Sequence, residues 1–237
     1  MSLPVAILAG GLATRLRPLT EKIPKALVEV ANRPFIAWQL EYLCAQGVKE
    51  VVVCAGYLGE QIVDAVGDGA QFGLRVRYSF DGDRLLGTAG AIRKALPLLG
   101  EAFFVFYGDS FLPINFGQVE EHFRTSGLRG LMTVLRNQNK WDRSNVEFEA
   151  GIVVEYNKIA PSPRMAFIDY GLSVLSASAV RDQSPATPAD LADVFHAMSC
   201  RGELAGLEMQ QRFYEIGSFA GLKETEEFLL GHANELR

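Results

Sequence analysis

The sequence predicts an α/β fold with a mixed, mostly parallel sheet and a β-rich second half. Short apolar segments alternate with helical patterns through the first half, which is typical of βαβ units. Beyond about residue 129 apolar and polar residues alternate, which favours β-strands. With 237 residues, 49% of them hydrophobic, the chain can bury one sizeable core. We therefore expect one domain, residues 1–237, whose halves 1–128 and 129–237 share one continuous sheet.

The first half is predicted to contain four strands, at Leu3–Ala9, Glu50–Ala55, Leu74–Ser79 and Phe103–Tyr107. Helices are expected between them, from a first-turn Pro34 to Gly47, around Glu60–Val66 and from near Thr88. In open α/β sheets ligands bind beyond the carboxyl ends of the strands. The loops after the first and fourth strands are therefore expected to face the same crevice.

The second half is predicted to consist mainly of strands, at Leu131–Leu135, Asn145–Phe148, Ile152–Asn157 and Phe167–Leu175. Thr187 and Pro188 are expected to cap a helix that runs through Ser199. A short strand near Leu207 and a last helix from about Leu222 complete the prediction. The sequence shows no internal repeat, low-complexity tract or linker.

Charge and cysteine content argue against several classes of protein. The net charge is −5, and no run of Lys or Arg resembles the basic stripe of a nucleic-acid-binding protein. The wide spacing of Cys44, Cys54 and Cys200 supports neither a disulfide framework nor a thiolate metal site. No signal sequence or apolar stretch of membrane-spanning length is evident. We expect a cytoplasmic protein that binds neither nucleic acid nor membrane, with a homo-oligomer left open.

The segment AILAGGLATRLRPLTEKIPKAL carries the strongest functional signal. Gly10 and Gly11 directly follow an apolar strand, so the backbone can approach a ligand and present its amides to phosphate oxygens. Neither the GxxxxGK[ST] phosphate loop nor the third glycine of a dinucleotide fingerprint is present. Four cations follow within a short stretch of this acidic chain, namely Arg15, Arg17, Lys22 and Lys25. The loop therefore predicts a positive pocket for a polyanion.

This loop, GGLATRLRPLTEKIPK, resembles the sugar-1-phosphate nucleotidyltransferase family, whose pattern is GGxGTRLxPxTxxxPK. Ala13 stands where the family usually has glycine, and a positive φ there would cost alanine about 1 kcal/mol. The resemblance covers essentially the whole chain and is more specific in the first half. It implies a Rossmann-like three-layer sandwich of the GT-A type. Among short members, the pattern is most similar to heptose 1-phosphate guanylyltransferases and N-acetylmuramate 1-phosphate uridylyltransferases.

The resemblance implies that residues 1–128 bind a nucleoside triphosphate. The segment LLGTAGAI resembles the family's nucleoside-binding turn, in which Gly87 and Thr88 approach the base and ribose. By structure alone, Thr88 would be an ordinary helix N-cap. A side chain before this turn reads the base, and the count leaves Phe80 and Asp81 as candidates, so the base stays open. The predicted nucleotide-binding residues are Leu8, Ala9, Gly10, Gly11, Thr14, Asp81, Gly87 and Thr88.

The same resemblance implies a magnesium site. FVFYGDS ends a buried strand with Asp109, which the family uses to hold magnesium, although an acid after glycine is also ordinary turn chemistry. In FYEIGSF, Glu215 stands where the family has Asp, and it would be the second ligand. Arg15 would neutralise the β and γ phosphates, and Lys25 the α-phosphate or the acceptor phosphate. The expected catalytic residues are thus Arg15, Lys25 and Asp109, and the expected cofactor is Mg²⁺.

Residues 129–237 are expected, on the same resemblance, to bind the sugar phosphate. EYNK matches the position of the family's phosphate-binding lysine, which gives Lys158 that role. Asn157 replaces the usual Glu that grips a sugar hydroxyl, which argues for a sugar other than plain glucose. IDYGLSVL fills the position of the sugar-pocket strand, although Asp169 could equally be an exposed hairpin residue. The predicted acceptor-binding residues are Asn145, Glu155, Lys158, Asp169 and Gly171.

The resemblance implies attack by a sugar 1-phosphate oxygen on the α-phosphorus of the triphosphate, with release of pyrophosphate. The NDP-sugar product would serve cell-envelope polysaccharide synthesis. A choline-phosphate cytidylyltransferase stays an alternative, because Trp141 and Tyr170 could line a quaternary ammonium pocket. A non-catalytic sugar-nucleotide-binding regulatory protein is the other alternative, but such a protein would be expected to lose some of the charged loop residues.

Overall fold

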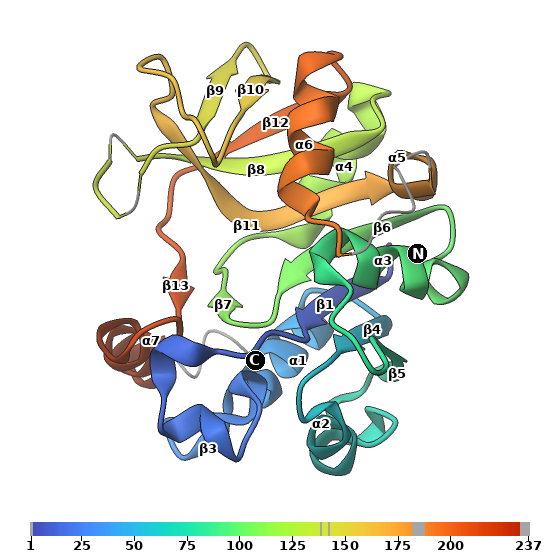
Figure 1. Ribbon diagram of the computed structural model, residues 1–237, viewed down its shortest axis with the longest axis vertical. Helices are drawn as coiled ribbons and strands as arrows, with labels where there is room; N and C mark the ends of the chain where they lie inside the picture. The colour runs from blue at the N-terminus through green and yellow to red at the C-terminus, as the bar shows by residue number, and fades with distance from the viewer. Residues whose placement is uncertain (1, 138, 142, 182–187, 233–237) are drawn as a thin grey trace.

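The computed structural model describes residues 2–137, 139–141, 143–181 and 188–232, and Figure 1 shows their arrangement. One nine-stranded sheet runs through the molecule in the order β5-β4-β1-β6-β11-β8-β12-β10-β9. Two clusters of buried apolar side chains lie on its two faces, one with α1, α2, α4 and α7 and the other with α3, α5 and α6. The predicted three-layer α/β sandwich with a mixed sheet is therefore confirmed.

The first half supplies the parallel part of the sheet. Its strands β1, β4, β5 and β6 pair in parallel and span Val5–Ala9, Glu50–Ala55, Arg75–Phe80 and Ala102–Tyr107. The helices α1, α2, α3 and α4 span Phe35–Ala45, Gly59–Val66, Gly87–Leu99 and Phe116–Ser126. Three two-residue strands, β2, β3 and β7, lie at Glu29–Val30, Arg33–Pro34 and Ser110–Phe111. The predicted strands of this half agree with the structure to within two residues.

The second half extends the same sheet. Its strands β8, β9, β10, β11, β12 and β13 span Gly130–Arg136, Val146–Glu149, Ile152–Tyr156, Phe167–Ser176, Leu204–Met209 and Tyr214–Glu215. Strand β11 lies between β6 and β8 and is antiparallel to both, so it joins the two halves. Within the described residues of this half, only β12 pairs in parallel, with β8. The expectation of one continuous sheet is confirmed.

Helix boundaries differ from the prediction where a local hydrogen bond decides them. Helix α6, Leu191–Cys200, has Asp190 as its N-cap, whose carboxylate accepts the Ala192 N–H, so the expected start was wrong. Of the two residues expected there, Thr187 lies outside the described residues. Helix α7, Phe219–His232, begins before the predicted Leu222 because Ser218 accepts the Gly221 N–H and the Leu222 N–H.

Two smaller corrections concern the helix starts of the first half. Pro34 is the N-cap of α1 and not its first-turn residue. Leu86 is the N-cap of α3, so the alternative that Thr88 is an ordinary N-cap is wrong. The short helix α5, Ala177–Arg181, was not predicted. Across the described residues, no helix is both long and apolar enough to cross a membrane.

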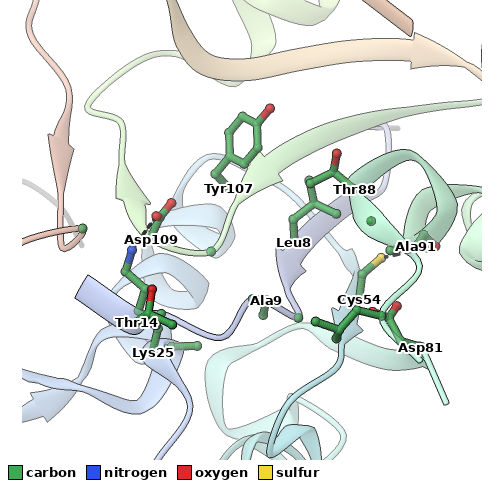
Figure 2. Close-up of a pocket in the computed structure, with 18 of the residues that line it drawn as sticks. Leu8, Ala9, Thr14, Lys25, Cys54, Asp81, Thr88, Ala91, Tyr107 and Asp109 are labelled. Atoms are coloured by element: carbon green, nitrogen blue, oxygen red, sulfur yellow. Dashed lines mark hydrogen bonds and ion pairs between the residues drawn. The ribbon is translucent and has the colours of Figure 1, made fainter. Parts of the chain in front are cut away.

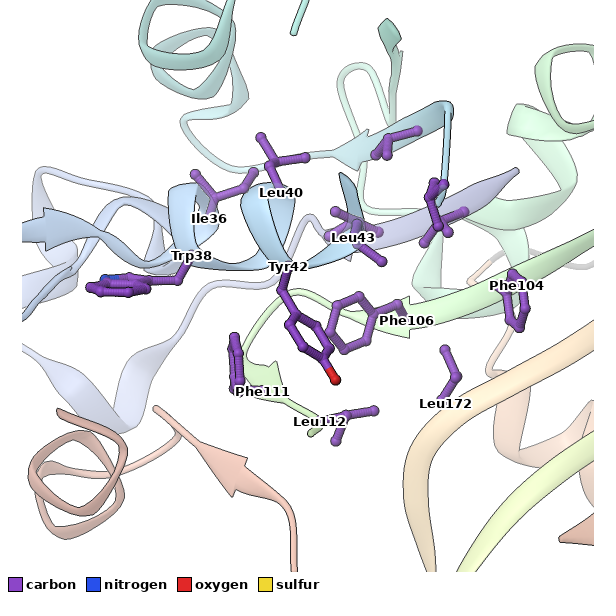
Figure 3. Packing of buried hydrophobic residues seen from close by; sticks show 14 of the residues in the cluster. Ile36, Trp38, Leu40, Tyr42, Leu43, Phe104, Phe106, Phe111, Leu112 and Leu172 are labelled. Carbon is purple, nitrogen blue, oxygen red and sulfur yellow. The ribbon is translucent and has the colours of Figure 1, made fainter. Parts of the chain in front are cut away.

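The core fixes the edge of the sheet at which polar loops emerge. Strand β6 presents Phe104 and Phe106 to the α1 face and Phe103 and Val105 to the other, and all four are buried. Figure 3 shows Tyr42 of α1 beside Phe106 and Phe111, with its ring centroid 5.1 Å from that of Phe111. Fully burying a Phe contributes about 2 to 3 kcal/mol. The buried side chains on both faces of the sheet thus hold the ends of β1 and β6 in place.

Candidate active site

A cavity of about 400 Å³ lies at the carboxyl ends of β1 and β6 (Figure 2). Because these strands are parallel neighbours, with Leu8 opposite Tyr107, the loops that follow them leave the sheet at the same edge. The loop after β1, the turn that opens α3 and the turn at Gly108–Asp109 all line this cavity. The prediction that the loops after the first and fourth strands face one crevice is therefore confirmed.

The structure brings together at this cavity every residue that the sequence analysis assigned to the nucleotide, together with Arg15, Lys25 and Asp109. It also separates the two candidates for reading the base. Asp81 lines the cavity and is buried, whereas the Phe80 ring lies against Gly59 of α2. The structure thus favours Asp81, although the binding roles of all these residues stay predictions.

The loop after β1 is held in a tight fold. Ala13 has φ 48° and ψ 41°, the left-handed conformation anticipated for this position. The buried hydroxyl of Thr20 donates to the Ala13 carbonyl oxygen at 2.8 Å and closes the loop on itself. Gly10 packs backbone to backbone on Gly56, where a Cβ would lie 2.7 Å from the Gly10 carbonyl oxygen. The loop therefore tolerates no side chain at Gly56, a residue that the sequence analysis did not single out.

Lys25 and Asp109 meet across the cavity. The Lys25 Nζ lies 2.6 Å from Asp109 Oδ2, although the residues are 84 positions apart in the sequence. The Lys25 side chain is 16% exposed and that of Asp109 32%, so the carboxylate stays accessible from the cavity. The Ser110 hydroxyl lies 3.4 Å from the other carboxylate oxygen. A cation from the first loop and an acid from the fourth strand thus form one pair at the cavity wall.

Gln39 braces the turn that carries Asp109, and the sequence analysis missed it. Its side chain is fully buried on α1, and its Nε2 donates to the carbonyl oxygens of Tyr107 at 3.1 Å and Ser110 at 2.8 Å. Among the described residues its Oε1 finds no partner. A buried amide without full pairing is costly, so such a group usually has a specific task. A lone glutamine within the apolar run FIAWQLEYL was the available signal.

A short strand ladder brings Glu215 to the same turn. Strand β13 pairs with β7 so that Glu215 lies opposite Ser110, and the Ile216 N–H donates to the Asp109 carbonyl oxygen at 2.9 Å. A Cβ on Gly217, which lines the cavity, would lie 3.3 Å from Glu215 Oε1 and 3.5 Å from an Arg15 guanidinium nitrogen. Glu215 itself lies just outside the lining, so it borders the cavity through Gly217.

The carboxylates of Asp109 and Glu215 fit a metal that arrives with phosphate. In the described part of the chain, no group of three or more His, Cys, Asp or Glu side chains could hold a metal ion. Magnesium commonly takes one or two carboxylates, completes its octahedron with water and substrate phosphates, and rarely uses an all-protein cage. Asp109, in the turn before β7, and Glu215, on the adjacent strand β13, lie beside a cationic loop and match that donor set.

The five predicted acceptor-binding residues, all of them described, lie outside the lining of this cavity, on and around β9, β10 and β11. Three of them form one group. The Asn145 side-chain oxygen accepts the Asp169 N–H at 3.2 Å, and Asp169 Oδ1 accepts the Gly171 N–H at 3.0 Å. Gly171 has φ 106°, and the pairing of β11 with β8 shifts register between Asp169 and Ser173. Asp169 pairs with Val134 of β8, and the irregular part of β11 begins directly after it.

Asp169 is a perturbed acid inside the sheet. Burial raises its pKa to about 6, while the Gly171 N–H and the charge of Lys158 offset part of that rise. The alternative that it is an exposed hairpin residue is therefore wrong. Burial raises the pKa of the phenol of Tyr107, which lines the cavity, well above its usual range, and the charge of Asp169 raises it further. In Figure 2 the Tyr107 ring points away from Lys25.

The two aromatic residues considered for a quaternary ammonium pocket are engaged elsewhere. Tyr170 is buried, packs edge-on against Phe213 and donates its hydroxyl to the Arg212 carbonyl oxygen at 3.4 Å. Trp141 has the Lys140 ammonium 4.7 Å from its ring centroid. Because a cation already lies over Trp141 and Tyr170 belongs to the core, the two rings do not form an open aromatic cage.

Fold and cavity together define a three-layer α/β protein, with cations at the carboxyl edge of its sheet. The model of the nucleotidyl transferase family matches residues 5–145, more than half of the chain, and the chain belongs to this family.

Two curated relatives and one solved structure are similar to this chain. It is 46% identical over 111 residues to N-acetylmuramate alpha-1-phosphate uridylyltransferase of Neisseria meningitidis, covering 46% of this chain and 48% of that protein. It is 30% identical over 235 residues to the mannose-1-phosphate guanylyltransferase catalytic subunit beta of Xenopus tropicalis, covering 95% of this chain and 62% of that protein. The chain therefore spans less than two thirds of the length of either relative.

The solved structure shares the fold. A Bacillus anthracis protein, proposed to be a glucose-1-phosphate thymidylyltransferase, superposes with a TM-score of 0.85 over 96% of this chain and 95% of that one. The two sequences are only 19% identical, so this likeness establishes the fold alone.

Proposed function

We propose that this protein transfers a nucleoside monophosphate from a nucleoside triphosphate to a sugar 1-phosphate, giving an NDP-sugar and pyrophosphate. The contact between Lys25 and Asp109, in a cavity lined by all the predicted nucleotide-binding residues, is the observation that carries the proposal. Family membership and the names of the two relatives support the same activity.

The chemistry requires no general base, because the attacking oxygen of a sugar phosphate is already an anion. The barrier lies in bringing two anions together and stabilising charge on the leaving pyrophosphate. In this proposal the backbone amides after Gly10 hold the triphosphate and Arg15 neutralises its β and γ phosphates. Lys25 is less exposed than Arg15 and neutralises the α-phosphate or the incoming acceptor phosphate. Such preorganised cations cost no reorganisation during the reaction.

Magnesium is the proposed cofactor, and Asp109 and Glu215 are the residues that would hold it. When bound, it supplies positive charge to the triphosphate oxygens. Lys25 keeps the Asp109 carboxylate in position at the wall, and Gln39 fixes the turn that carries it.

The acceptor is proposed to bind beside Tyr107, toward the Asp169 group. Tyr107 lines the cavity at the end of β6, and β6 pairs with β11, the strand that carries Asp169. Lys158 lies close enough to lower the pKa of Asp169, and we assign it the sugar phosphate. The name of the Neisseria meningitidis relative supports N-acetylmuramate 1-phosphate as a candidate acceptor. The proposed role is cell-envelope polysaccharide synthesis in the cytoplasm.

A panel of substrates tests this function. GTP, UTP, CTP, dTTP and ATP are each combined with the 1-phosphates of glucose, mannose, heptose and N-acetylmuramate, and pyrophosphate release is followed with and without magnesium. We expect one combination to exceed the others and to need the metal. CTP with phosphocholine is the comparison that tests the cytidylyltransferase alternative. The proposal is overturned if folded, magnesium-loaded protein releases no pyrophosphate with any of the sugar phosphates. The Asp109→Asn variant measures the background rate.

A further inference from the structure

Residues 188–191, here called the strap, cross the N-terminus of α3 at the nucleotide cavity. The Ala189 carbonyl oxygen accepts the N–H groups of Ala89 at 2.9 Å and Gly90 at 3.4 Å, and the Ala189 N–H donates to the Leu86 carbonyl oxygen at 2.9 Å. The N-cap Leu86 has no side chain that could accept these amides. The strap therefore satisfies donors that a helix N-terminus otherwise leaves unpaired.

The strap also holds the two residues predicted to approach the nucleoside. Gly87 has φ 74°, and a Cβ there would collide with the Ala189 carbonyl oxygen, so the strap lies directly on the turn. The Thr88 hydroxyl donates to Asp190 Oδ1 at 2.9 Å and accepts the Leu191 N–H at 2.8 Å. Since both Gly87 and Thr88 line the cavity, the strap determines the position of this part of its wall.

The strap is anchored in the other half of the molecule. It leads into α6, whose first residue Leu191 is buried and whose Ser199 hydroxyl accepts the N–H of Tyr156 on β10 at 3.0 Å. His196, on the same helix, lies with its Nδ1 2.7 Å from the Tyr156 carbonyl oxygen. Helix α6 thus connects β10, which precedes Lys158, with the turn that opens α3.

We infer that Asp190 is a positioning residue for the nucleotide, acting through Thr88 to fix the Gly87–Thr88 turn. The sequence analysis did not single it out, because it lies 102 positions from Thr88. The inference deepens the proposed function and rests on it for the identity of the ligand. Asp190 does not line the cavity, so its effect reaches the nucleotide only through the turn.

The test compares three variants of the full chain. Asp190→Ala removes both the Thr88 contact and the cap of α6. Asp190→Asn keeps an oxygen for both, because asparagine caps helices as well as aspartate does. Asp193→Ala removes an exposed acid from the first turn of the same helix and controls for charge.

Binding of UTP and of GTP, each with magnesium, is measured by titration calorimetry without acceptor, and KM and kcat are measured in the pyrophosphate assay. For Asp190→Ala we expect the Kd and the KM for the triphosphate to rise about tenfold, which corresponds to the loss of one hydrogen bond. The KM for the sugar phosphate should change little. Asp190→Asn should restore binding, and Asp193→Ala should leave it unchanged.

Two outcomes overturn the inference. One is unchanged triphosphate binding by Asp190→Ala, with or without a lower melting temperature, which would make the strap purely structural. The other is failure of Asp190→Asn to restore binding while it restores the melting temperature. If no sugar phosphate is a substrate but Asp190→Ala still weakens UTP or GTP binding, the proposed function fails and the positioning role stands.

Discussion

The two halves of the chain carry their predicted binding residues on different kinds of strand. In residues 1–128 those residues follow parallel strands, and all of them line one cavity. In residues 129–237 the predicted acceptor-binding residues lie on or beside the antiparallel strands β9, β10 and β11, outside that cavity. Parallel strands release their loops at one edge, whereas antiparallel strands alternate direction, so register decides which of their side chains meet.

The difference teaches how far a motif can be placed without coordinates. A glycine-rich loop after a first parallel strand must emerge beside the loop of its neighbour, as Lys25 and Asp109 do. No neighbouring loop allows Asp169 to be placed in this way, because its surroundings depend on the irregularity that follows it in β11. Substitutions in the two halves test this contrast, and the largest effect is expected at Lys25.

Lys25→Ala should lower turnover by about 100- to 1000-fold, because the cation stabilises charge in the transition state. Since Lys25 lies at the cavity wall and not in the core, the melting temperature should change little. Initial rates of pyrophosphate release and calorimetry measure the two effects. Lys22→Ala, an exposed cation of the same loop outside the cavity lining, is the matched control and should retain most activity. A large loss of stability would assign Lys25 a structural role and weaken the contrast.

Asp169 should make the second half sensitive to pH. Its folded pKa of about 6 lies above its unfolded value, so the native state binds the extra proton between about pH 4 and pH 6. Stability therefore falls as pH rises through that window, by about 3 kcal/mol at most. Asp169→Asn keeps an oxygen for the Gly171 N–H and avoids the buried charge.

Urea unfolding of both proteins at several pH values measures this effect. The variant should be more stable than the parent at pH 7 and equal to it near pH 4. It should also bind the sugar phosphate less well if Asp169 contacts the acceptor. Parallel stability curves across the whole range would mean that Asp169 titrates normally.

Asp81→Asn should change the preference among the five triphosphates by about tenfold, because a carboxylate only accepts hydrogen bonds whereas an amide also donates. The ratios of kcat/KM across the panel measure it. Asp83→Asn is the control, since Asp83 is exposed two residues further along the same loop. Equal losses with every base would show that Asp81 supports the loop and does not read the base.

Ala13→Gly should stabilise the protein by up to about 1 kcal/mol, because glycine adopts φ 48° without the steric cost to alanine. The greater freedom of glycine in the unfolded chain offsets part of the gain. Ala197→Gly in the middle of α6 should have the opposite sign, since helical backbone favours alanine. Urea midpoints compare the two variants, and a destabilised Ala13→Gly protein would mean that the loop is not strained.

Sequence reasoning located the first-half site because each of its signals is local. Gly10, Arg15 and Lys25 lie in one motif, and Asp109 ends a recognisable buried strand. It missed Gln39 and Asp190, whose contacts are made with residues more than sixty positions away. The alternative that Thr88 is the N-cap of α3 was also wrong, since Leu86 is the N-cap and the strap pairs the first amides of the helix.

By itself the sequence determined the long strands of the sheet, most of the helices, the cationic glycine-rich loop and the acid at the end of β6. Apolar periodicity and glycine content specify these features over short stretches of chain. Only the tertiary structure decided that Asp81 and not Phe80 faces the cavity, that Glu215 reaches the Asp109 turn through β13, and that the strap holds Thr88. Those contacts join distant segments, so strand pairing and packing fix them, and local sequence pattern does not.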